Sequence, residues 1–193
     1  MTTEQLKNDL DYVAAVVRRR DRPAGVPAIF FLWAAVIAVG FALVDFARHA
    51  PGLFLWFWMI AGWGGGLFSM WLGVRDAKQR GIRDREEGRR WGLHWLTGGA
   101  AYLLIVLPLA LGRVPPQQGG LGFLLVTGLL YALAGVHLER RLLWPGLMLL
   151  LAYGAMTVFM PPYAWTITGL LVGVALAWAG FSALKARKAG AAQ

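Results

Sequence analysis

Cysteine is absent from the 193 residues, and acidic residues are scarce: Asp and Glu number 10, against 19 Lys and Arg. The lack of cysteine excludes a disulfide framework, a thiolate metal site and a cysteine nucleophile. Charged residues make up only 15% of the chain, whereas 58% of its residues are apolar. A single soluble core of this length cannot bury so much apolar surface, so the composition predicts a protein that lies in lipid.

Charge is also absent from six apolar runs, each long enough to cross a hydrocarbon core of ~30 Å as an α-helix. The runs show no sustained alternation of apolar and polar residues, which disfavours a transmembrane barrel. They predict an all-α integral membrane protein, a six-transmembrane-helix bundle of three helical hairpins, with spans at 28–44, 53–74, 91–112, 120–138, 142–160 and 163–184. The membrane domain is expected over 25–186, between an N-terminal region at 1–24 and a short tail at 187–193.

Lys and Arg are unevenly distributed among the segments that join the spans. Seventeen of the 19 lie in the N-terminal region, in the 75–90 loop, in the turn near 140 or after 184, which six spans place on one side of the membrane. By the positive-inside rule this side is cytoplasmic, so we expect both termini to be cytoplasmic, in a membrane such as the bacterial inner membrane. The basic residues expected to anchor this side to lipid headgroups are Arg18, Arg19, Arg20, Arg140 and Arg141.

Two cytoplasmic segments have a pattern of their own. Apolar residues from Leu6 to Val17 recur at helical spacing, which predicts an amphipathic helix that either lies on the leaflet or docks to a partner or a sister subunit. The 75–90 loop, "RDAKQRGIRDREEGRR", holds seven basic and four acidic residues. Mixed signs predict a solvated helical hairpin, in which the second span continues to Arg80, and they argue against a nucleic-acid partner.

Small residues at four-residue spacing occur in three of the spans. Such residues let helix backbones approach closely in lipid, so they predict helix packing within the chain or, for the sixth span above all, a homo-oligomer seam. The residues concerned are Gly62, Gly66, Gly128, Ala132, Gly169, Gly173 and Ala177.

Two prolines predict local geometry. Pro108 lies inside the third span, where a missing amide hydrogen and a bulky ring should bend the helix. Pro145 lies just after "HLERRLLW", a connection too short for a wandering loop. The fourth and fifth spans should therefore be adjacent and antiparallel, with Pro145 in the first turn of the fifth.

Within the spans, the candidates for chemistry are histidines. No Asp, Glu, Lys or Arg lies in the six runs, so we expect no catalytic residues, no carboxylate proton relay and no metal site. His94 and His137 are expected at similar depth on antiparallel helices. Two neutral imidazoles can ligate haem iron, and an imidazole can hydrogen-bond a quinone carbonyl. A purely structural role for both histidines is the simpler alternative, in which case no cofactor is bound.

Three functional classes are compatible with these patterns. The first is a non-enzymatic membrane protein, a regulatory or accessory subunit that docks a membrane or cytoplasmic partner through the amphipathic helix and the 75–90 loop. The second is a small channel or permease gated at the glycine cluster 62–66. The third is an electron-transfer subunit that uses His94 and His137 to hold haem or quinone.

Overall fold

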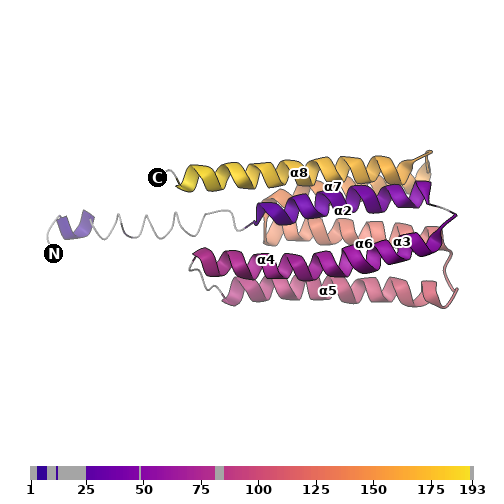
Figure 1. Cartoon of the computed structure of the whole chain (residues 1–193), viewed down its shortest axis with the longest axis horizontal. Coiled ribbons are helices and arrows are strands. Elements are labelled where there is room, and N and C mark those ends of the chain that lie inside the picture. Colours follow the sequence, from indigo (N-terminus) through magenta and orange to yellow (C-terminus); the bar gives the residue numbers. More distant parts are fainter. Residues whose placement is uncertain (1–3, 8–11, 13–24, 48, 81–84, 192–193) are drawn as a thin grey trace.

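The computed structural model describes residues 4–7, 12, 25–47, 49–80 and 85–191. Within these ranges every regular element is helical (Figure 1). The elements in chain order are α2 (Pro27–Phe46), α3 (Pro51–Phe57), the π-turn η1 (Trp58–Trp63), α4 (Gly64–Arg80), α5 (Arg85–Ala110), α6 (Pro116–His137), the short 3-10 turn η2 (Arg140–Leu142), α7 (Leu143–Val158) and α8 (Ala164–Ala191). Six helical segments are long and apolar enough to cross a membrane, as the six runs predict, and α3, η1 and α4 together make the second of them.

The helices run side by side along the long axis of the bundle (Figure 1). We name the two ends of the bundle by their residues. The charged end holds Gly25, the end of α4, the start of α5, the η2 turn and the end of α8. The proline end holds the connections between α2 and α3, between α5 and α6, and between α7 and α8. Proline opens α2, α3 and α6, where its fixed φ suits the first turn and its missing amide hydrogen leaves no bond unmade.

The most extensive packing joins two pairs of spans, the first with the last and the fourth with the fifth. The first helix, α2, packs along the last, α8, and α6 packs along α7. Gly169 and Gly173 of α8 face the backbone of α2, so the two helices approach each other closely. Leu124, Leu149 and Leu176 are almost fully buried where the two pairs meet. The core is therefore made by α2, α6, α7 and α8.

The second and third spans lie outside this core. Only 6% of each is buried inside the protein, against 28% to 44% of the other four. Among the described residues, no Cα atom of α4 lies within 8 Å of a Cα atom of α5. The two spans joined by the charged loop therefore present most of their side chains outward.

The connection between α6 and α7 confirms the predicted antiparallel neighbours. Pro145 is the third residue of α7, and the η2 turn reverses the chain before it. The second span continues to Arg80, as predicted, but it is not one α-helix. The π-helix η1 is followed directly by Gly64–Gly66, where glycines enforce α-helical geometry only weakly. The sequence pattern did not predict this π-helix.

Other predictions meet the structure only in part. Pro108 lies inside α5, two residues before its end, and the predicted bend remains a prediction. Residues 4–7 are helical, whereas most of the predicted amphipathic helix, with Arg18, Arg19 and Arg20, lies outside the described residues. At the other end, α8 continues past residue 186 to Ala191, and the predicted tail at 187–193 stays a prediction.

Candidate functional site

Charged side chains from distant parts of the chain meet at the charged end. Arg187 of α8 donates two hydrogen bonds to the carboxylate of Asp76 of α4, from Nη1 to Oδ1 at 2.9 Å and from Nη2 to Oδ2 at 3.2 Å. The same Nη2 donates to the main-chain oxygen of Gly25 at 2.7 Å. A bidentate pair of this kind fixes both distance and orientation, so it ties α4, α8 and the chain before α2 together.

Glu139 extends this arrangement to the turn between α6 and α7. Its Oε2 accepts a hydrogen bond from the amide of Gly25 at 3.2 Å, and its Oε1 accepts one from Nη1 of Arg141 at 3.0 Å. The main-chain amide of Gly25 is thus held by Glu139, and its main-chain carbonyl is held by Arg187. We call Gly25, Asp76, Glu139, Arg141 and Arg187 the polar cluster.

Local structure explains how the sequence brings the cluster together. α4 and α8 both continue past their apolar stretches, and these extensions carry Asp76 and Arg187. Glu139 lies in extended backbone, with φ of −140° and ψ of 105°, just after α6 ends. A Cβ atom at position 25 would lie 2.8 Å from the Phe30 ring and 3.3 Å from Oε2 of Glu139, so glycine is required there.

The cluster is sheltered from solvent. The side chains of Asp76 and Arg187 are 15% and 28% exposed, and that of Glu139 is 8% exposed. By contrast, the Arg90–Glu86 ion pair on the outer surface of α5 is more than 60% exposed on both sides. Sheltered charges are screened little by salt, so the cluster pairs interact more strongly than the surface pair.

Two further polar contacts connect α2 to its neighbours. Nε1 of Trp33 donates to the hydroxyl of Ser69 on α4 at 3.0 Å. A Cβ atom at Gly65 would lie 3.6 Å from the same Trp33 ring. At the proline end, Oδ2 of Asp45 accepts two bonds from Thr166 of α8, one from its amide and one from its hydroxyl, each 2.8 Å long.

The two histidines of the spans have different surroundings. Nε2 of His94 lies 3.1 Å from the main-chain oxygen of Leu130 on α6, and a carbonyl only accepts, so Nε2 carries the hydrogen and donates. Leu130 precedes His137 by seven residues, about 10 Å along a helix at ~1.5 Å per residue. His137 itself is exposed at the end of α6. The similar depth of the two histidines stays a prediction.

The hydrogen bond of His94 determines which of its ring nitrogens could hold a haem or quinone together with His137. Because Nε2 of His94 donates to the Leu130 carbonyl, Nδ1 is the ring nitrogen left to ligate iron, and a carbonyl acceptor on the other nitrogen is common in ligating histidines. Its ring also packs edge-on against Trp95, with centroids 5.2 Å apart. In the part of the chain that the structure describes, no group of three or more His, Cys, Asp or Glu side chains is arranged to hold a metal. Haem or quinone at His94 and His137 stays a prediction.

The small residues of the packing prediction fall into two groups. Gly169 and Gly173 face α2, and an added Cβ at Gly169 would lie 2.6 Å from Phe41. An added Cβ atom at Gly128 would lie 2.9 Å from the Leu150 side chain of α7. Ala132 is contacted by the α7 backbone at Gly146, and Ala177 packs against the core cluster.

Glycines of the second span have different surroundings. An added Cβ at Gly66 would meet nothing within 4 Å, and one at Gly62 would meet only the Trp58 ring of its own span, at 3.8 Å. Neither glycine has a neighbouring helix of the described chain against it. The face of α4 that contacts α2 is instead the one that carries Gly65 and Ser69.

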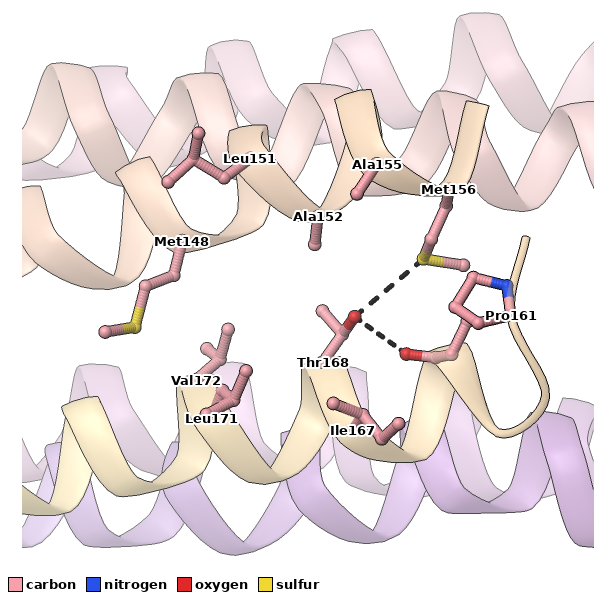
Figure 2. A pocket seen from close by; sticks show the side chains of 11 residues that line it. Met148, Leu151, Ala152, Ala155, Met156, Pro161, Ile167, Thr168, Leu171 and Val172 are labelled. Atoms are coloured by element: carbon pink, nitrogen blue, oxygen red, sulfur yellow. Dashed lines mark hydrogen bonds between the residues drawn. The ribbon is translucent and has the colours of Figure 1, made fainter. Parts of the chain in front are cut away.

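An apolar pocket of about 320 Å³ lies between α7 and α8, nearer the proline end. Figure 2 shows Met148, Leu151 and Met156 on one wall, facing Thr168 and Val172 on the other. The Thr168 hydroxyl, the polar group drawn at its centre, donates to the main-chain oxygen of Ala164 at 2.8 Å and lies 3.8 Å from the Met156 sulfur. Because this hydroxyl already has its acceptor inside the protein, the pocket offers a ligand little beyond apolar contact.

Sequence reasoning identified part of the polar cluster. Arg140 and Arg141 are the two basic residues expected at the headgroups near this turn; Arg141 pairs with Glu139, and Arg140 is exposed. Asp76, Arg187 and Gly25 were missed. The available signal was an acid and a base one or two turns beyond the ends of two apolar spans, but no spacing in the sequence connects residues that lie 111 positions apart.

The arrangement can hold helices in a fixed relation, and the described interior is otherwise apolar. The buried polar or charged residues of the described chain are Glu139 and Thr168. Comparisons with known protein families, with curated proteins and with solved structures found no match for this chain.

Proposed function

We propose that this chain is a non-enzymatic membrane protein, a regulatory or accessory subunit that binds a partner through its charged end. The observation that supports this most directly is the polar cluster, which holds α4, α8, the start of α2 and the α6–α7 turn in one arrangement. Charged and hydrogen-bonding groups gather at this end, beside the 75–90 loop. A fixed platform next to a solvated charged loop suits protein docking.

We place the charged end in the cytoplasm. Seventeen of the 19 Lys and Arg residues belong to sequence segments that six spans assign to one side, which is the distribution that the positive-inside rule associates with the cytoplasmic side. Arg140, Lys185 and Lys188 are exposed there, at the level expected for lipid headgroups. The membrane proposed is a bacterial inner membrane, with lipid around all six spans.

The alternatives have less support from the geometry. A channel or permease needs a polar path, and the core where the four packed helices meet is lined by Leu124, Leu149, Leu176 and similar apolar side chains. A haem- or quinone-binding subunit could use only Nδ1 of His94, because Nε2 is bonded to Leu130, and its second histidine, His137, is exposed at the end of α6. Partner binding requires neither feature.

Affinity capture from detergent-solubilised membranes tests the proposal. The wild-type chain is compared with a loop variant in which Glu86, Glu87, Arg89 and Arg90 are replaced by alanine, a change that removes two charges of each sign, and with a chain lacking residues 1–20. The matched control replaces Gln117 and Gln118, exposed at the opposite end, with alanine. We expect a partner that the wild type and the control retain and the loop variant or the shortened chain loses. Identical partner sets for all four proteins, or no partner for any, would contradict the proposal.

A further inference from the structure

The α4 segment is attached to the rest of the protein differently from the core helices. α8 and α2 pack along their whole length, whereas α4 contacts α2 near Gly65 and Ser69 and reaches α8 through the Asp76–Arg187 pair. No Cα atom of α4 lies within 8 Å of a Cα atom of α8 in the described chain. Side chains, not backbone packing, connect the charged end of α4 to the bundle.

The other end of α4 begins at a point where a helix bends easily. The π-turn η1 ends at Trp63, and glycines follow at 64, 65 and 66. Kinks in helices concentrate at π-bulges and at small residues, because the i→i−4 bond ladder is interrupted there. Added Cβ atoms at Gly64 and Gly66 would meet nothing within 4 Å, whereas one at the buried Gly65 would lie 3.6 Å from the Trp33 ring, so this stretch is packed on its α2 side only.

The half of the span before the hinge is held firmly. A Cβ atom at Gly40 of α2 would lie 2.8 Å from the Phe57 ring and closer still to the Trp58 ring, so these aromatic side chains lie directly on the α2 backbone. Trp58 also contacts Phe41, with ring centroids 6.4 Å apart. Phe57, just before η1, and Trp58, its first residue, thus pack on α2, and beyond Gly66 the side chains of Ser69 and Asp76 connect α4 to α2 and α8.

We propose that α4 is a hinged arm, which pivots at η1 and Gly64–Gly66 and is latched to α8 by the Asp76–Arg187 pair. Arg187 also holds the Gly25 carbonyl, so the latch joins the arm to the point where the N-terminal region meets the bundle. Buried ion pairs determine where groups sit more than they add stability, which suits a latch. The arm carries the 75–90 loop, to which the proposed function assigns partner binding. The hinge and the latch do not depend on that function, and only the idea that a partner moves the arm rests on it.

The chain is well suited to a direct measurement of this motion, because it contains no cysteine that would need to be removed. Spin labels at Lys78→Cys and Lys188→Cys report the distance between the free end of the arm and α8; both positions are exposed. A control pair, Leu53→Cys with Leu170→Cys, lies on the proline-end side of the hinge and is also exposed. Pulsed electron resonance in lipid nanodiscs then gives both distance distributions.

The latch is broken in two ways and matched with a control. Arg187→Gln removes the base, Asp76→Asn removes the acid, and Arg90→Gln removes a base from the exposed Arg90–Glu86 pair. From Gly64 to Lys78 the arm is about 21 Å long at ~1.5 Å per residue, so a kink of about 20° moves its end by about 7 Å. We expect the Lys78–Lys188 distribution to lengthen or broaden on that scale in both latch variants and to stay unchanged in Arg90→Gln, with the Leu53–Leu170 distance constant throughout.

A second substitution tests the hinge. Adding Gly64→Ala and Gly66→Ala to Arg187→Gln stiffens the pivot without a steric clash, and we expect the broadened distribution to narrow again. Unchanged Lys78–Lys188 distances in both latch variants would overturn the proposal. So would movement of both label pairs together, or failure of both variants to form the bundle, since the pair would then be required for folding. The measurement uses no partner, so it fails or succeeds independently of the affinity capture.

Discussion

Asp45 caps the N-terminal turn of α8 from the far end of α2: one carboxylate oxygen accepts both the amide and the hydroxyl hydrogen of Thr166, at 2.8 Å each. The first and last helices are therefore joined by polar contacts near both ends, here by Asp45 and at the charged end by Gly25 and Arg187. An acid beside a helix N-terminus also interacts favourably with the helix dipole. This contact should have a measurable effect on stability.

Replacing Asp45 with alanine removes a capping acceptor, so we expect the free energy of unfolding to fall by about 1 kcal/mol. Asp45→Asn keeps an oxygen acceptor but loses the charge, so it should lose less. Unfolding of the detergent-solubilised protein by added SDS, followed by tryptophan fluorescence, measures both. A loss in Asp45→Asn as large as that in Asp45→Ala would mean that charge, and not hydrogen bonding, supplies the effect.

Gly146 should tolerate no side chain. A Cβ atom there would collide with the Ala132 backbone of α6, 2.7 Å from its Cα atom, so Gly146→Ala must push α6 and α7 apart. We expect a loss near the upper end of the ~1–3 kcal/mol typical of overpacking. Gly154→Ala, on the same helix with nothing within 4 Å, is the matched control and should be neutral or stabilising by up to ~1 kcal/mol. Equal effects of the two changes would show that α6 and α7 do not pack as described.

The two histidines should respond differently to substitution. His94→Ala removes the bond to the Leu130 carbonyl, and we expect a loss of about 1 kcal/mol, typical of one hydrogen bond. His137→Ala, at an exposed helix end, should cost little. The same SDS titration measures both, and visible absorption of the purified protein is recorded beside it. A Soret band that either substitution abolishes would instead support haem ligation.

The orientation of the bundle can be tested with single cysteines. Arg140 and Gln117 are exposed at opposite ends, in the η2 turn and in the first turn of α6. A membrane-impermeant maleimide should label Gln117→Cys in intact cells, and Arg140→Cys only in inverted vesicles. Labelling of Arg140→Cys from outside would reverse the proposed topology.

The helices could be predicted from the sequence, because length and the absence of charge are local properties. Spans 28–44 and 120–138 differ from α2 and α6 by a few residues at most. The proximity of Pro145 to a short basic turn likewise predicted the α6–α7 neighbours. Local patterns of this kind need no knowledge of the partner helix.

Pairings between distant helices could not be predicted in the same way. Apolar runs are nearly interchangeable in composition, so nothing in the sequence indicated that α2 packs along α8 while α4 and α5 stay apart. Gly66 and Gly169 look alike in sequence, yet one faces open space and the other faces Phe41. The Asp76–Arg187 pair of the polar cluster was missed for the same reason, since the two residues are adjacent only because of these pairings.

The pairing of α2 with α8 also has a consequence for how the protein is made. The first span leaves the ribosome long before its main partner exists, because α8 is the last helix in the chain. At about 5–20 residues per second, the delay is on the order of ten seconds. During that time α2 lies in the bilayer without α8. The face of α2 that carries Ala34 and Ile37, and that later packs on the glycines of α8, must be covered by lipid or by an insertion factor. A nascent chain stalled before Ala164 should therefore leave α2 accessible to cross-linking, and release of the completed chain should abolish it.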